Sequence, residues 1–407
     1  MRAIICGGGI GGLTLAWWLR RAGWQVTVVE QADGPRGGGY MMDFWGAGIT
    51  VAGQMGLLPA LSEAHVPISA LEYRDAGGRR HGRIDYPRVA GVIGGQVFSL
   101  MHGSLHRILL DAVVAEQVDL RYGGTVERAD DGPSGLRVTL TGGHVETTDL
   151  LVGADGVHSR IRALLFGPEQ RWLRPLGYHT AAYRVRDPAL RREIGSEIVI
   201  IAEPGRQVAL YPTADGQLAA WLVHRTDEPV PADPARAIKD RYAGMGDLAE
   251  HALARCPQDD RLYYDVVAQI ELHRWHSGRA VLIGDAAGAV SLMAGQGAVL
   301  AMAGAHALAA ELDGTSVPGS DGAMAAPAAK DDLPAALQRY EARFRPSTVR
   351  AQRAGRRTAR WLVPSSHGAL RVRAGALRLL GLPSTEILIR AASGLAQRHR
   401  RRAVLKA

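Results

Sequence analysis

The sequence predicts a mixed α/β protein, in which a Rossmann-like domain is interleaved with an antiparallel β-sheet domain and followed by C-terminal helices. An apolar strand at residues 2–6 runs directly into a glycine-rich turn and a helix. Residues 175–225 contain short runs of β-branched and aromatic residues separated by turns, which is typical of an antiparallel sheet. The end of the chain is basic and amphipathic, as expected for surface helices.

The first unit, residues 4–30, has the pattern strand, turn, helix, strand and predicts a dinucleotide site. Gly7, Gly9 and Gly12 form the spacing G-x-G-x-x-G. The first glycine permits the tight turn, the second lets the backbone approach a pyrophosphate, and the third lets the helix lie close to the sheet. The helix N-terminus offers unpaired N–H groups and a partial positive charge to phosphates. Glu30 ends the second strand, where a carboxylate suits a ribose diol.

Two later blocks also combine an apolar strand with a turn of small and acidic residues. Residues 149–162, DLLVGADGVHSRIR, form a strand that ends in an Asp-Gly turn and is followed by an arginine. Residues 279–312 place a strand before Gly284-Asp285, then a loop with Gly295-Gln296-Gly297, then a long helix of small residues. Residues 335–357 predict a helix that stops at Pro346 and resumes after it.

The middle of the chain predicts the antiparallel sheet and its cover. Strands are expected at residues 178–185, 197–202, 207–211 and 218–224, and the Asp-Gly pair at 215–216 is typical of a hairpin turn. Residues 225–260 are expected to form helices over one face of this sheet. Residues 313–333 are of low complexity and are expected to form a loop between two helices.

The composition argues against several other classes of protein. The chain has 407 residues, a formal charge of +8 and only two cysteines, Cys6 and Cys256, which support neither a disulfide framework nor a metal cluster. We expect no signal peptide before the first strand, and no apolar run approaches the ~20 residues of a membrane span. The late arginine-rich stretches lack an aromatic platform, so a solvated helical face is favoured over a nucleic-acid partner. The sequence therefore predicts a cytoplasmic protein without a metal, membrane or nucleic-acid partner.

The ordered set of blocks resembles the FAD-dependent aromatic hydroxylases, the single-component (group A) flavoprotein monooxygenases. The blocks at 335–357 are most similar to antibiotic-modifying and natural-product-tailoring members. The resemblance implies non-covalent FAD, NADPH or NADH as a transient reductant, and O2. It implies oxygenation of an aromatic or polycyclic small molecule through a flavin 4a-hydroperoxide, by a monomer or weak homodimer. It also implies an FAD-binding domain at 1–174 and 262–345, a substrate domain at 175–261, and a C-terminal helical cover at 346–407.

The resemblance also implies roles for individual residues. The Asp-Gly block, with Asp155, Gly156, Ser159 and Arg162, would support FAD and the nicotinamide. The substrate candidates on the sheet face above the flavin are Tyr183, Tyr211, Trp221 and His224, each of which also fits ordinary core packing. The catalytic candidates are His102, Gly295 and Gln296. The cofactor-binding candidates are Gly7, Gly9, Gly11, Gly12, Glu30, Gln31, Arg36, His102, Arg107, Val126, Asp155, Asp285, Gly295, Gly297 and Ala298.

The sequence departs from the family pattern beside the flavin. His102 stands where an arginine is usual, with Arg107 one turn later as a possible substitute, while Gly288 and Leu292 replace a histidine and a loop proline. Because histidine titrates near neutrality, we expect flavin properties to vary with pH between about 5.5 and 7.5.

These departures leave a second function class open. In that class a dehydrogenase, oxidase or cyclase uses FAD on the same scaffold without oxygen transfer, and a reductase of isoprenoid chains is a minor variant. A plain nicotinamide dehydrogenase is disfavoured, because the Asp-Gly and Gly-Asp blocks would then have no role.

Overall fold

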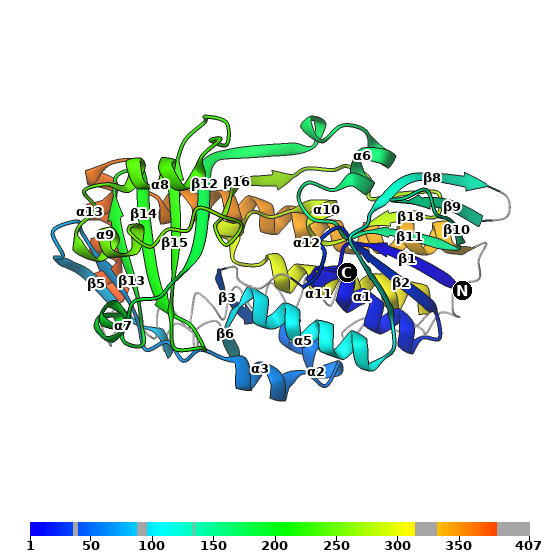
Figure 1. Cartoon of the computed structure of the whole chain (residues 1–407), viewed down its shortest axis with the longest axis horizontal. Helices are drawn as coiled ribbons and strands as arrows, with labels where there is room; N and C mark the ends of the chain where they lie inside the picture. Colours follow the sequence, from blue (N-terminus) through cyan, green and yellow to red (C-terminus); the bar gives the residue numbers. More distant parts are fainter. Residues whose placement is uncertain (36–39, 88–95, 133–134, 314–331, 381–407) are drawn as a thin grey trace.

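A computed structural model describes residues 1–35, 40–87, 96–132, 135–313 and 332–380. Two large sheets lie at opposite ends of an elongated molecule, and one long helix, α12 (Leu333–Leu362), extends from one toward the other (Figure 1). No described helix is long and apolar enough to cross a membrane.

The first sheet has six strands in the order β17-β18-β11-β1-β2-β7. Their bounds are β1 Arg2–Cys6, β2 Gln25–Glu30, β7 Asp119–Tyr122, β11 Leu150–Gly153, β17 His276–Ser277 and β18 Ala280–Leu282. All neighbours pair in parallel except β17 and β18, and the central strands are almost wholly apolar because they are buried in the main core. The helices that pack in this core include α1 Ile10–Arg21, α5 His102–Ala115 and α11 Gly297–Asp313.

Smaller elements surround this sheet. A three-stranded sheet has the order β10-β9-β8, with β8 Val126–Gly132, β9 Gly135–Leu140 and β10 Val145–Thr148. A ribbon pairs β3 Met41–Trp45 with β6 Val97–Met101, and α2 Ala47–Gln54 and α3 Leu58–Ala64 lie between them in the chain. Two short helices, α6 Arg160–Phe166 and η1 Glu169–Arg171, come after β11 in the chain. Two more, α10 Gly284–Gly288 and η2 Leu292–Ala294, come after β18.

The second sheet has seven strands in the order β16-β12-β15-β14-β13-β4-β5. Their bounds are β4 Ala70–Arg74, β5 Arg80–Asp85, β12 Leu173–Val185, β13 Glu197–Glu203, β14 Arg206–Pro212, β15 Leu218–Arg225 and β16 Tyr263–Ile270. One face, here called the outer face, packs on α7 Pro188–Ile194, α8 Pro234–Tyr242 and α9 Asp247–Leu253. The inner face packs on α13 His367–Leu380 through Leu370 and Leu377.

The seven-stranded sheet is larger than the predicted segment 175–261. It includes β4 and β5 from much earlier in the chain, and β16 continues it to Ile270. β13 pairs in parallel with β4, with Glu197 opposite Ala70, so this edge is completed by a distant segment. The strands β4 and β5 carry several charged residues and give a weak strand pattern, which is why the sequence did not predict them.

The helix α12 corrects the prediction that a helix stops at Pro346. It continues unbroken from Leu333 to Leu362 with Pro346 inside it. Pro346 is exposed, so its ring meets solvent rather than a packed neighbour, while buried residues on both sides of it fix the helix on the protein. The predicted boundary at 345/346 therefore falls within one helix. The predicted loop at 313–333 and the end of the chain lie almost entirely outside the described residues.

Candidate functional site

Of the three glycines in the turn after β1, only Gly9 has open space beside it. A Cβ on Gly7, whose φ is +109°, would lie 2.4 Å from the carbonyl oxygen of Ala154, and one on Gly12 would lie 2.0 Å from that of Gly7. A Cβ on Gly9 would meet nothing within 4 Å. The first and third glycines are therefore needed for packing, whereas Gly9 borders open space, as the predicted approach of a pyrophosphate requires.

Glu30 is held beside this turn by backbone donors. The N–H of Gly8 donates to its Oε2 at 2.8 Å, and the N–H of Ala32 donates to its Oε1 at 2.9 Å. His106 Nε2 lies 2.8 Å from the carbonyl oxygen of Gly8, on the other side of the turn. The carboxylate is thus fixed at the end of β2, in the place where a ribose would be bound.

The remaining residues predicted around the dinucleotide differ in their surroundings. Gly11 lies inside α1 and packs on Ala301 of α11, while Gln31 and Arg107 are exposed. Val126 is buried in the core, and its carbonyl oxygen already accepts from Arg160 Nε at 2.8 Å. Arg36 lies outside the described residues.

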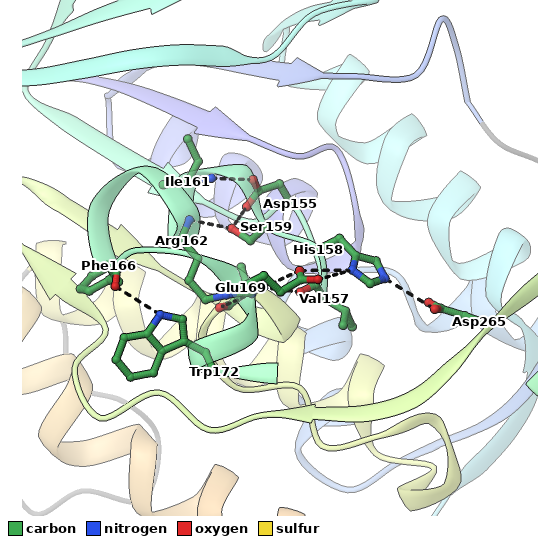
Figure 2. A network of polar contacts seen from close by, with 11 residues as sticks. Asp155, Val157, His158, Ser159, Ile161, Arg162, Phe166, Glu169, Trp172 and Asp265 are labelled. Atoms are coloured by element: carbon green, nitrogen blue, oxygen red, sulfur yellow. Dashed lines mark hydrogen bonds and ion pairs between the residues drawn. The ribbon is translucent and has the colours of Figure 1, made fainter. Parts of the chain in front are cut away.

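Asp155 shapes its own loop, as Figure 2 shows. Its Oδ1 accepts from Ser159 Oγ at 2.5 Å and its Oδ2 accepts from the N–H of Ile161 at 3.0 Å. Ser159 in turn accepts from the N–H of Arg162 at 2.9 Å and so caps α6. Burial raises the pKa of Asp155. Both carboxylate oxygens of Asp155 therefore hold the turn, and its predicted contact with the cofactor stays a prediction.

Arg162 joins the Asp-Gly turn to the Gly-Asp turn. The residue is completely buried, and its Nη1 donates to the carbonyl oxygen of Ala286 at 3.2 Å. Its Nη2 donates to the carbonyl oxygen of Val157 at 2.5 Å and to Glu169 Oε2 at 3.1 Å. The sequence assigned this arginine to the cofactor, but its guanidinium points into the protein and ties together the two loops that flank the site (Figure 2).

His158 links the same loop to the second sheet, and the sequence gave no indication of this. Its Nδ1 lies 3.1 Å from Glu169 Oε1, and its Nε2 lies 3.5 Å from Asp265 Oδ1 on β16 (Figure 2). Asp265, and then Glu169, raise the pKa of His158 to about 9, so the imidazole is cationic at neutral pH. Only the tertiary structure brings these groups together, since Asp265 is distant in sequence.

A cavity lies between these loops and the second sheet. It is lined by Tyr40, Met42, Val157, Thr180, Tyr263, Asp265, Val266, Val267, Ala268, Asp285, Ala289, Val290, Ser291, Leu292, Gly295, Gly297 and Ala298. The lining unites the predicted Gly-Asp turn and the loop at 291–297 with strands β12 and β16. The predicted residues Asp285, Gly295, Gly297 and Ala298 are therefore brought together around one space.

Asp285 is the free carboxylate of this cavity. Its side chain is exposed to the cavity and forms no hydrogen bond or ion pair with any residue in the described ranges. The protein that surrounds the cavity desolvates this carboxyl and raises its pKa. An unpaired carboxylate in such a place is suited to accept hydrogen bonds from the hydroxyl groups of a bound ligand.

The helix α11 begins at the edge of the same cavity. Gly295 adopts a left-handed conformation with φ +62°, Gln296 follows, and the helix starts at Gly297. The first N–H groups of this helix have no partner within it and carry a partial positive charge. Its first turns are slim because they consist largely of small residues, so a planar ring system has room to approach.

His102 does not line the cavity itself but packs against Tyr40, which does. Its backbone N–H donates to the carbonyl oxygen of Tyr40 at 3.0 Å, and its ring centroid is 5.7 Å from that of Tyr40. Burial and then the nearby His106 lower the pKa of His102 to about 4. The expectation that His102 changes its charge between about pH 5.5 and 7.5 is therefore corrected: with this pKa, His102 is already neutral throughout that range.

The lowered pKa of His102 predicts a loss of stability in acid. Because the unfolded chain binds the proton near pH 6.5 and the folded chain only near pH 4, stability is full above pH 6.5 and falls as the pH drops through this range. His102→Gln should remove this part of the pH dependence of the thermal midpoint, whereas His273→Gln, a change at an exposed histidine, should leave it unchanged. Equal acid dependence in wild type and His102→Gln would contradict the burial argument.

The four substrate candidates divide between the two faces of the second sheet. Tyr211 and Trp221 lie on the inner face, where Tyr211 Oη accepts from the N–H of Met41 at 3.0 Å and Trp221 Nε1 donates to Thr180 Oγ1 at 2.9 Å.

Tyr183 and His224 lie on the outer face, so their prediction as substrate residues is wrong. Tyr183 Oη donates to the carbonyl oxygen of Ala252 at 3.0 Å, and His224 Nδ1 is 3.1 Å from Tyr242 Oη. Since strand residues alternate between faces, Trp221 and His224, three positions apart, cannot both face the cavity.

Several known proteins are similar to this chain. The family model described as an FAD binding domain matches residues 1–316. The flavin-dependent monooxygenase eupH of Phoma sp is 31% identical over 337 residues, covering 77% of this chain and 77% of that protein. The structure of Klebsiella pneumoniae HpxO complexed with FAD and uric acid is 22% identical, has a TM-score of 0.78, and covers 97% of this chain and 96% of that chain. The tetracycline destructase Tet(51) is also 22% identical with a TM-score of 0.76, covering 96% and 97%.

Proposed function

Since the chain belongs to the FAD-binding class A flavin monooxygenases, we propose that it oxygenates an aromatic or polycyclic small molecule between the flavin and the second sheet. The chain is an FAD-dependent monooxygenase, and NAD(P)H is the typical reductant of its family. The balanced reaction consumes substrate, NAD(P)H, a proton and O2, and it yields the hydroxylated product, NAD(P)+ and water. The observation that carries the proposal is the cavity that joins the Gly-Asp turn to the inner side of the sheet.

The described residues fit FAD along its whole length. The open space at Gly9 suits the pyrophosphate, and Glu30 stands where the adenosine ribose would lie. The unpaired carboxylate of Asp285 suits a hydroxyl of the ribityl chain, and the start of α11 suits the ring system. Bound FAD supplies the redox chemistry, and the protein supplies position, electrostatics and exclusion of water.

The start of α11 is proposed to stabilise negative charge at one edge of the reduced flavin. Gly297 and Ala298, whose N–H groups have no partner within the helix, line the cavity. Such preorganised donors act most strongly on charge that develops during a reaction. In this proposal, Gly295 and Gln296 set the direction from which the helix approaches the flavin.

The inner face of the sheet is proposed to bind an apolar, ring-shaped substrate. Tyr211 and Trp221 belong to a cluster with Met101 and Ile200, and α13 closes the far side through Leu377. Pockets for drug-sized rings are mostly apolar with few polar groups, and this face has that character. The domain limits and the substrate roles of Tyr211 and Trp221 are part of this proposal.

Isotope labelling tests the proposed reaction. The holoenzyme, NADPH or NADH and a panel of electron-rich polycyclic phenols are incubated under 18O2, and each product is analysed by mass spectrometry. One 18O atom in a hydroxylated product is expected. A dehydrogenated or cyclised product without 18O would instead support the second function class, in which FAD accepts hydride without oxygen transfer.

Asp285→Asn should weaken FAD binding without unfolding the protein. A hydrogen bond to a charged acceptor contributes about 1.5–3 kcal/mol, so the Kd from titration of the apo-protein should rise roughly ten- to hundredfold. Asp265→Asn is a matched control, because this aspartate lines the same cavity but is already paired with His158. An unchanged Kd for Asp285→Asn would show that its carboxylate does not bind the flavin.

A further inference from the structure

Ser291 holds a backbone conformation that side chains rarely adopt. Its φ is +78° and its ψ is 146°, and it is one of two non-glycine residues with positive φ in the described ranges, the other being Gln117. Glycine would adopt this conformation without strain, whereas a residue with a Cβ is strained in it. Strained residues of this kind cluster at functional sites, so the side chain of Ser291 calls for an explanation.

The hydroxyl of Ser291 has no partner in the described part of the chain. Ser291 is 7% exposed, and its Oγ is a buried polar atom without a hydrogen bond. The residue nevertheless lines the same cavity as Asp285, Gly297 and Ala298. A buried hydroxyl without a partner destabilises the folded protein, and a hydrogen bond to a ligand atom in the cavity would recover this loss. By contrast Ser159 uses its hydroxyl to cap a helix.

Two buried glutamines clamp the segment that leads into Ser291. Gln269 Nε2 donates to the carbonyl oxygen of Val290 at 3.0 Å, and Gln352 Nε2 donates to that of Ala289 at 3.0 Å. Gln269 Nε2 also donates to the carbonyl oxygen of Gln352 at 2.9 Å, which joins the two glutamines. Two side-chain hydrogen bonds thus fix the backbone immediately before the strained residue, and a third joins the two glutamines.

The helix α12 packs closely against the same loop. A Cβ on Gly355 would lie 2.9 Å from the carbonyl oxygen of Val290 and 3.0 Å from the Cβ of Ala294. Met293, between these two loop residues, packs in one cluster with Ala359 of the helix. The loop is therefore held on both sides of Ser291, which explains how a strained conformation persists. Gln352 and Gly355 lie beyond residues 1–316, the part that the family model matches.

We propose that the Ser291 hydroxyl hydrogen-bonds the isoalloxazine ring of FAD and that α12, with Gln269, holds the loop so that this contact forms. The hydroxyl can donate to a ring nitrogen or carbonyl oxygen, or accept from a ring N–H. Glycine at this position would avoid the strain, so the presence of serine is explained by the hydroxyl that it places in the cavity. Ser291 is thus a cofactor-binding residue, and Gln269 and Gln352 are positioning residues.

Three variants separate the effect of the Ser291 hydroxyl from the effect of the backbone strain. Ser291→Ala removes the hydroxyl and keeps the strain, Ser291→Gly removes both, and Ser291→Cys keeps the shape but hydrogen-bonds weakly. FAD affinity is measured by titration of each apo-protein, together with the visible spectrum and reduction potential of the bound flavin. A neutral hydrogen bond predicts a Kd about three- to tenfold higher for all three variants, with a shifted flavin band.

The thermal midpoint of the apo-proteins distinguishes a binding role from a structural one. Ser291→Gly should unfold at a higher temperature than Ser291→Ala, because glycine relieves the strain, yet it should bind FAD no better. Relative to wild type, Ser291→Gly would then be more stable but would bind FAD more weakly. If all three variants keep the wild-type Kd, flavin spectrum and potential, Ser291 does not contact the flavin and the proposal is overturned, whatever happens to stability.

Discussion

Gly9→Val should give a folded protein that no longer retains FAD. Gly9 has φ −78° and ψ −176°, which residues with a side chain adopt readily, and its Cβ would meet no protein atom within 4 Å. The valine side chain would instead occupy the space of the pyrophosphate. We expect the Kd for FAD to rise at least about a hundredfold, equivalent to roughly 2.8 kcal/mol, with an unchanged far-UV circular dichroism spectrum.

Gly12→Ala is the matched comparison for this prediction. Its Cβ would lie 2.0 Å from the carbonyl oxygen of Gly7, so the turn or the helix α1 must shift. This variant should therefore lose thermal stability as apo-protein, which Gly9→Val should not. Normal FAD binding by Gly9→Val would mean that the pyrophosphate does not pass over this glycine.

Arg162→Met should destabilise the protein by about 3 kcal/mol or more. The methionine would leave the carbonyl oxygens of Val157 and Ala286 without their donor, and Glu169 without its buried ion-pair partner. Because Ala286 directly follows Asp285, FAD binding should weaken as well. Chemical denaturation of the apo-protein measures the first effect, and titration with FAD measures the second.

Arg171→Met provides the control for Arg162. Arg171 is exposed near the same network and lies over the ring of Trp172, with the guanidinium carbon 5.7 Å from the centroid. Its replacement should change the free energy of unfolding by less than about 1 kcal/mol. Similar losses for the two variants would show that Arg162 does not join the two loops more strongly than a surface arginine does.

The parts of the site that the sequence predicted depend on local geometry. The G-x-G-x-x-G spacing, Glu30 at the end of the second strand, and Gly284-Asp285 after an apolar strand each lie within one short unit. Parallel strands place their carboxyl ends at one edge of a sheet, so such units converge wherever the strands pair. The structure accordingly brings Asp285, Gly295, Gly297 and Ala298 around one cavity.

The errors concern side chains whose orientation or environment depends on distant segments. Tyr183 and His224 looked like ligand residues, but α8 and α9 cover the face on which they lie. Arg162 looked like a cofactor residue, but its guanidinium is buried and donates to Ala286, Val157 and Glu169. His102 looked titratable near neutrality, yet burial and His106 keep it neutral.

The sequence by itself determined the fold class, the position of the glycine-rich turn and the order of the motifs, because spacing within a strand–turn–helix unit is a property of the local chain. Only the tertiary structure decided which face of the second sheet looks toward the cavity and that β4, β5 and β16 complete that sheet. It also decided that α12 runs through Pro346 to support the loop at Ser291. These features arise from burial and hydrogen bonds between segments far apart in the chain, and no local pattern encodes which distant side chain will take up a given polar atom.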